Sequence, residues 1–133
     1  MLVRNIMTPS PVCVEPRTRL KDAVDLMYAA DVRHVPVLEG RMLVGILSER
    51  DLRSLWDIAF DPTVNDGRLY QHRVAEVMSH DPVTISDEDT IDDVIDLLVE
   101  HRIGAVPVID ADGALTGIVS YVDVLRAARG KLG

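Results

Sequence analysis

The chain has 133 residues, 47% of them hydrophobic and 27% charged, which is enough for one compact domain with a buried core. No apolar run reaches the roughly 20 residues of a membrane span, and Arg4 and Asn5 break the first apolar stretch, so neither a membrane helix nor a signal peptide is predicted. The net charge of −8 argues against nucleic acid or an anionic membrane as the main partner, and the lone Cys13 requires no oxidising compartment, so we expect a cytoplasmic protein.

The elements of the first half follow from hydrophobic spacing and turn residues. In chain order, they are an extended stretch over residues 12–14, a helix from about residue 19, strands over 35–38 and 43–47, and a helix from near Ser48 to about Trp56. Apolar side chains at i, i+3, i+4 and i+7 from Leu20 indicate that the first helix is amphipathic, and Thr18 is its expected N-cap.

The second half has the same plan. A predicted loop over residues 57–72, with Pro62 and Gly67, joins the halves. The elements that follow are an extended stretch over 83–85, a helix capped by Asp89 or Thr90, strands over 106–109 and 115–119, and a helix from Ser120 to about Arg129 that ends before Gly130. The order is therefore β-α-β-β-α, twice.

The two halves match each other at an offset of about 71 residues. The matching pairs include Met7 and Met78, Pro11 and Pro82, Pro36 and Pro107, Gly45 and Gly117, Ser48 and Ser120, and Asp51 and Asp123. One extra residue is needed in the second half, in the turn at residues 110–113, where length is tolerated. Matches over nearly the whole half, with a single gap in a turn, indicate a duplication.

Neither half is expected to be stable alone, because a sheet of about three short strands covered on one face leaves apolar surface bare. We predict a mixed α/β (α+β) fold in which the two β-α-β-β-α repeats pack sheet to sheet about a pseudo-twofold axis, with clefts at their shared seam. The predicted boundaries are 1–56 for the first repeat, 57–72 for the linker and 73–133 for the second repeat. The start at Met1 favours a free-standing protein.

Several short motifs recur in both halves. They are Ile6-Met7, Pro11-Val12, His34-Val35-Pro36-Val37 and residues 45–52, with the counterparts Val77-Met78, Pro82-Val83, residues 105–108 and residues 117–124. Together, in this order and twice, they resemble the CBS domain, whose tandem pair is called a Bateman module. The resemblance implies a non-catalytic sensor that binds AMP, ADP, ATP, S-adenosylmethionine or NAD(H) in the cleft between the two motifs.

The run Gly-x-x-Ser-x-x-Asp, from a strand end into a helix start, carries the expected ligand chemistry. Its glycine permits a close backbone approach, and Ser48 and Ser120 lie where unpaired helix N–H groups favour a phosphate oxygen. The resemblance implies that Asp51 and Asp123 accept the two ribose hydroxyls. The competing interpretation is that the serines are plain N-caps and that the aspartates serve the helix dipole.

Basic side chains suited to phosphate occur in the first half. The resemblance implies that Arg33 and His34 reach the phosphates, and Arg50 is a further candidate; the alternative for Arg33 is a solvated surface side chain. Gly104 and Ala105 occupy the matching positions of the second half, so one strongly basic phosphate region is predicted. The candidate ligand-binding residues are Arg33, His34, Val35, Ser48, Arg50, Asp51, Gly104, Ala105, Val106, Ser120 and Asp123.

Other chemistries are less well supported. The histidines lack metal-ligand spacing, and the acidic run at residues 87–93 is either a cation site or, as we prefer, a solvated helix start. No nucleophile–base pair or Gly-rich phosphate loop is present, so we predict no enzyme and no required cofactor. The chief alternative function is a ligand-free scaffold that acts through dimerisation or partner binding. A homodimer formed through the helices and a protein effector are the expected partners.

Overall fold

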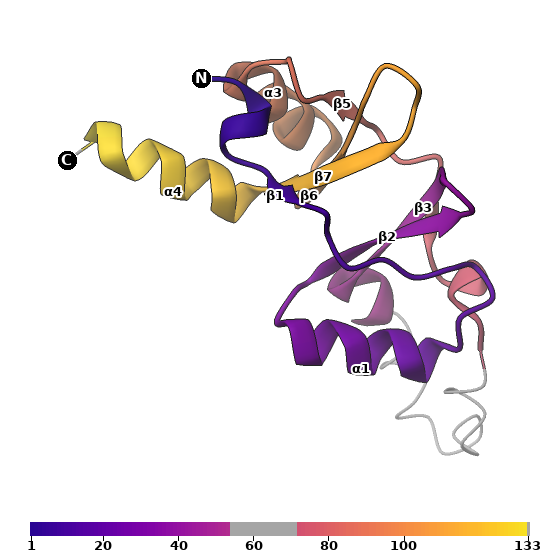
Figure 1. Ribbon diagram of the computed structural model, residues 1–133. Coiled ribbons are helices and arrows are strands. Elements are labelled where there is room, and N and C mark those ends of the chain that lie inside the picture. Colours follow the sequence, from indigo (N-terminus) through magenta and orange to yellow (C-terminus); the bar gives the residue numbers. More distant parts are fainter. Residues whose placement is uncertain (54–71, 133) are drawn as a thin grey trace. The chain divides into compact units, whose positions relative to one another are not determined.

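The computed structural model describes residues 1–53 and 72–132, so the expected end of the second helix at Trp56 and nearly all of the expected linker 57–72 lie outside the described residues. The chain divides into two compact units (Figure 1). Unit 1 consists of residues 1–11 and 82–133, and unit 2 consists of residues 12–81. Each unit is described by itself. Within the described ranges, no helix has the length and apolar character needed to cross a membrane.

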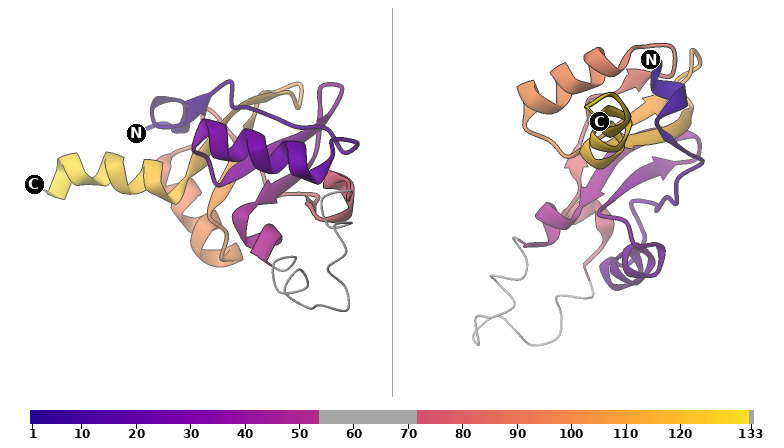
Figure 2. Two further views of the ribbon diagram at one scale, coloured as in Figure 1. Left: turned by 90° about the horizontal axis from the view of Figure 1, so that it is seen from below. Right: turned by 90° about the vertical axis from the view of Figure 1, so that its left-hand side faces the viewer.

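Unit 2 is a small sheet packed against one complete helix and against a helical segment that begins after Ser48 and is described as far as residue 53. Its elements are α1 (Leu20–Ala30), β2 (His34–Glu39), β3 (Met42–Ser48), a 3-10 turn η3 (Val74–Glu76) and β4 (Ser79–His80). The sheet order is β2-β3-β4, with antiparallel pairing throughout. Helix α1 buries Leu20, Ala23 and Met27 in one core with Val35 and Leu47 of the hairpin. Figure 2 shows the ribbon of this helix beside the hairpin. The predicted amphipathic stripe of this helix is therefore its core-facing side.

Unit 1 repeats this plan with an additional paired strand. Its elements are η1 (Val3–Asn5), β1 (Thr8–Pro9), β5 (Ile85–Ser86), α3 (Ile91–His101), β6 (Ala105–Ile109), β7 (Leu115–Ser120) and α4 (Tyr121–Leu132). The sheet order is β1-β7-β6-β5, and β5 runs parallel to β6. Val94 of α3 and Val124 of α4 are buried with Val106 and Val119 of the sheet, so both helices contribute to the core of this unit.

The predicted strands of both hairpins and the predicted helices at Leu20, Thr90 and Ser120 are confirmed, but two helix ends differ. Helix α1 has Arg19 as its N-cap, because the Thr18 hydroxyl instead accepts a hydrogen bond from the Glu15 N–H. Helix α4 continues to Leu132, so the predicted end before Gly130 is wrong. Thr90 does cap α3, since its hydroxyl accepts a hydrogen bond from the Asp93 N–H.

The compact units do not coincide with the sequence repeats, because each repeat gives its first residues to the other unit. Val3, from the first repeat, is fully buried in the core of unit 1, and Val74, from the second repeat, is fully buried in the core of unit 2. The chain leaves these segments through Ser10 and Asp81, which are equivalent in the repeat and have φ values of 46° and 49°. A left-handed backbone at a non-glycine residue is uncommon, so the two crossing points share one unusual conformation.

Candidate functional site

The motif glycines lie where each exchanged segment pairs with its sheet as an edge strand. A Cβ added to Gly45 would lie 2.6 Å from the Met78 sulfur and 2.8 Å from the Ser79 carbonyl oxygen. A Cβ added to Gly117 would lie 2.6 Å from the sulfur of Met7, in the equivalent arrangement of unit 1. The close backbone approach predicted for these glycines is confirmed. It accommodates the repeated methionine and the strand that follows it.

In unit 2, the Ser-x-x-Asp run forms a reciprocal cap at a helix start. The Ser48 N–H donates to Asp51 Oδ2 at 2.9 Å, and the Asp51 N–H donates to Ser48 Oγ at 3.1 Å. The other carboxylate oxygen, Oδ1, accepts a hydrogen bond from the Ser79 hydroxyl at 3.2 Å. The Asp51 carboxylate is therefore held through both of its oxygens.

In unit 1, the equivalent run has the same cap with a different environment for the carboxylate. The Ser120 N–H and hydroxyl both donate to Asp123 Oδ2, at 2.8 Å and 3.1 Å. The Asp123 N–H donates back to Ser120 Oγ at 3.3 Å. Asp123 Oδ1 lies 4.0 Å from an Arg126 guanidinium nitrogen, whose side chain is 73% exposed. The capping role that competes with ligand binding is thus present in both units.

The predicted basic group lies in unit 2, next to Asp51. Arg33 precedes β2, and its guanidinium lies 3.6 Å from the Glu49 carboxylate. The backbones of the two residues are also joined, because the Glu49 N–H donates to the Arg33 carbonyl at 2.8 Å. His34 stands opposite Ser48 in the β2–β3 register. Burial lowers the pKa of the His34 imidazole, while the negative charges of Asp51 and Glu49 oppose that shift. Arg50 is exposed in the first turn of the helix that begins after Ser48.

The corresponding positions of unit 1 carry no charge. Gly104 and Ala105 lie before and at the start of β6, and the Tyr121 N–H donates to the Gly104 carbonyl at 3.0 Å, as Glu49 does to Arg33 in unit 2. Val35 and Val106 are buried strand residues, so their side chains serve the cores of their units. The structure thus groups six of the candidate residues in unit 2 and five in unit 1. These are Arg33, His34, Val35, Ser48, Arg50 and Asp51, and then Gly104, Ala105, Val106, Ser120 and Asp123.

The sequence interpretation missed Ser79. Its equivalent in the first repeat is Thr8, and both are hydroxyl residues that directly follow the repeated methionine. That repetition was the available signal. What could not be seen was that the exchange of segments places Ser79 beside the aspartate of the first repeat.

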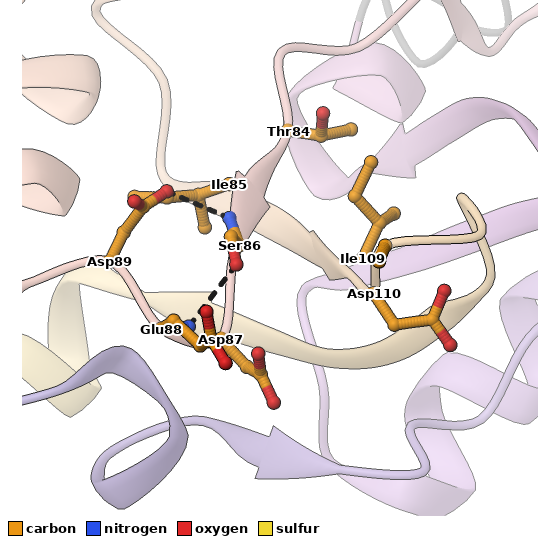
Figure 3. Close-up of a pocket in the computed structure, with 9 residues that line it drawn as sticks. Thr84, Ile85, Ser86, Asp87, Glu88, Asp89, Ile109 and Asp110 are labelled. Carbon is orange, nitrogen blue, oxygen red and sulfur yellow. Dashed lines mark hydrogen bonds between the residues drawn. The ribbon is translucent and has the colours of Figure 1, made fainter.

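A hollow of about 420 Å³ in unit 1 has none of these candidates in its lining. Figure 3 shows the residues that line it. It is lined by residues 84–89 and 109–111, at the carboxyl ends of the parallel strands β5 and β6. The Ser86 N–H donates to the Asp89 carboxylate at 2.9 Å, so this acidic residue stabilises the turn that leads into α3. Across the described part of the chain, no group of three or more His, Cys, Asp or Glu side chains is placed to hold a metal ion.

Comparison with known proteins decides the family. The CBS domain model matches residues 3–57 and 74–130, which are the two sequence repeats. The chain belongs to the CBS domain family. A CBS domain-containing protein of Dictyostelium discoideum is 33% identical over 129 residues, which cover 94% of this chain and 89% of that protein.

CBS pairs of known structure have the same fold. The crystal structure of CBSX2, a CBS-pair protein of Arabidopsis thaliana, in complex with AMP superposes with a TM-score of 0.82 at 31% identity, covering 99% of this chain and 98% of that one. The inosine-5′-monophosphate dehydrogenase of Aquifex aeolicus is 30% identical over 122 residues, but this chain spans only 23% of its length. The likeness to that enzyme is therefore confined to a CBS-sized part of it.

Proposed function

We propose that this CBS pair is a non-catalytic, cytoplasmic sensor module that binds an adenosine nucleotide through its Ser-x-x-Asp runs and the basic residues beside them. The observation that carries the proposal is the grouping of Asp51, His34 and Arg33 in one unit, with Arg50 in the following helical turn. A carboxylate accepts hydrogen bonds from a ribose diol, and guanidinium groups bind phosphate. The AMP complex of CBSX2, to which the whole chain is similar, supports this choice of ligand class.

Such a module regulates by shifting a conformational equilibrium. A ligand can do this only to the extent that it binds the two states with different affinity. We propose that the output passes to a protein effector or to a second copy of the chain. The ligand-free scaffold is the alternative, and the reciprocal caps at Asp51 and Asp123 give it a specific physical basis, since each aspartate already stabilises a helix start.

Isothermal titration of AMP, ADP, ATP, NADH and S-adenosylmethionine into the wild-type protein tests the sensor function. We expect saturable binding that weakens at least about tenfold in Asp51→Ala or Asp123→Ala, because a charge-assisted hydrogen bond contributes about 1.5–3 kcal/mol. Asp→Asn variants are the matched controls for folding, since asparagine retains a cap acceptor that alanine lacks. Absence of binding by every ligand to a folded wild-type protein would favour the scaffold.

We also propose that two copies associate through α3 and α4 of unit 1. Val99 on α3 and Leu125 on α4 are 72% and 62% exposed, and the partly exposed Ile95 and Val122 lie about one turn earlier on the same helices. The two helices contact each other, so their apolar side chains belong to one surface region. Helix α3 carries acidic residues and α4 carries Arg126 and Arg129. A twofold contact between copies can therefore pair opposite charges around an apolar centre.

Light scattering after size exclusion measures the mass that this contact produces. The wild-type protein is expected to have the mass of a dimer, and Leu125→Glu that of a monomer, because a carboxylate would be desolvated at the contact. Met42→Glu is the control, since Met42 is 69% exposed but lies in the hairpin of unit 2. A dimer that persists in Leu125→Glu contradicts an interface on α4.

A further inference from the structure

We propose that Ser79 is a positioning residue for Asp51, and that it makes Asp51 rather than Asp123 the carboxylate that binds the ligand's diol. The inference rests on the proposed function and specifies which of the two equivalent motifs performs it. Ser79 belongs to the second sequence repeat but lies in unit 2. The residue that prepares the site in the first repeat is therefore supplied by the other repeat.

The first step of the argument is the orientation of the Asp51 carboxylate. The Ser48 amide holds Oδ2 at 2.9 Å and the Ser79 hydroxyl holds Oδ1 at 3.2 Å, from two segments far apart in the sequence. Two donors on different oxygens oppose rotation of the carboxylate about its Cβ–Cγ bond. Each ionised oxygen keeps a further lone pair. Two acceptors thus remain in a fixed relation, which suits two adjacent hydroxyl groups and reduces the entropy lost on binding.

The second step is the contrast with unit 1. All hydrogen bonds that Asp123 accepts from Ser120 go to Oδ2. Among the described residues, Thr8, the equivalent of Ser79, makes no hydrogen bond to Asp123, and Oδ1 has only the long contact of 4.0 Å to Arg126. An exposed ion pair at that distance contributes little orientation. The Asp123 carboxylate is therefore held at one oxygen only. A bound diol would have to fix the orientation of this carboxylate, which costs conformational entropy.

The third step is charge. A nucleotide presents phosphates as well as a diol, and the basic residues predicted to bind phosphate lie in unit 2 with Asp51. At equivalent positions of the two motifs, Arg33 and Arg50 are basic in unit 2, whereas Gly104 and Val122 are uncharged in unit 1. Unit 1 has Arg126 beside Asp123, at 4.0 Å from Oδ1. The better-oriented carboxylate and the basic residues thus occur in the same unit. Because both features occur in unit 2, we expect one site of high affinity, centred on Asp51.

Calorimetric titration of AMP and of its 2′,3′-dideoxy analogue into four full-length proteins tests the proposal. The proteins are the wild type, Ser79→Ala, Ser79→Thr and the matched control Thr8→Ala. We expect Ser79→Ala to weaken AMP binding about three- to tenfold, which corresponds to one hydrogen bond of ordinary net strength, because Ser79 acts on the ligand only through Asp51. Ser79→Thr should restore the affinity because it keeps the hydroxyl, and Thr8→Ala should bind as the wild type does.

The dideoxy analogue separates positioning from a general structural effect. It has no diol, so wild type and Ser79→Ala should bind it equally, whereas an altered fold would weaken both ligands. The inference is overturned if Ser79→Ala binds AMP with wild-type affinity, if its loss is the same for both ligands, or if Thr8→Ala is the variant that weakens binding. In each of these cases AMP still binds the wild type and the proposed function stands. If no adenosine ligand of the titration series binds the wild type, both are wrong.

Discussion

Replacing Val3 by alanine should destabilise the strands of the second sequence repeat and leave those of its own repeat protected. Val3 is fully buried with Val106, Val108 and Val119, so the change leaves a cavity in the core of unit 1. We expect a loss of about 2 kcal/mol, which is typical of removing buried methyl groups. Amide hydrogen exchange should report it as faster exchange in β6 and β7 than in the wild type, with β2 and β3 less affected.

Val74→Ala is the reciprocal control for this experiment. Val74 comes from the second repeat but lies fully buried with Val35 and Leu47 of unit 2. Its exchange pattern should therefore be reversed, with β2 and β3 losing protection. If each variant instead loosened the strands of its own repeat, the exchange of segments between the units would be wrong.

Gly117→Ala is expected to destabilise the protein by about 2–3 kcal/mol, within the range for overpacking a core. The new Cβ would lie 2.6 Å from the Met7 sulfur and 2.9 Å from the Thr8 carbonyl oxygen. The methionine side chain can move, but the carbonyl belongs to β1, whose Pro9 pairs directly with Gly117. Relief therefore requires the strand itself to shift. Chemical denaturation of the variant against the wild type measures the loss.

Gly113→Ala separates this steric effect from the usual cost of replacing a glycine. Gly113 lies in the β6–β7 turn with φ of +84°, and no atom lies within 4 Å of an added Cβ. Its replacement should cost only about 1 kcal/mol, from the left-handed backbone. Combining Met7→Ala with Gly117→Ala should recover part of the stability but not all, because the carbonyl contact remains. A loss of stability in Gly117→Ala no larger than that in Gly113→Ala would contradict the close approach of β1 to Gly117.

Much of the fold could be predicted from the sequence, because the patterns that indicate its helices and hairpins involve residues close together in the chain. The apolar spacing from Leu20 predicts α1, and the two apolar runs on either side of the turn at Glu39 and Gly40 predict the β2–β3 hairpin. Each signal depends on residues within one turn or one strand pair. The duplication is equally visible, because equivalent residues occur at a constant offset. The repeated motifs, taken together and in order, led to the family, and the Ser-x-x-Asp run within them led to Asp51 and Asp123 as candidates.

The sequence by itself thus determined the duplication, the order of elements, the family and the candidate chemistry. Only the tertiary structure decided which segments share a core. Val3 and Val74 are equivalent at the repeat offset, but nothing near Val3 in the sequence says that it is buried in the core of the other repeat. Strand β1 has two residues and no periodicity, and its pairing of Thr8 with Ile118 joins distant parts of the chain. The contact between Ser79 and Asp51 arises from the same exchange, because it forms only after Ser79 has crossed into unit 2.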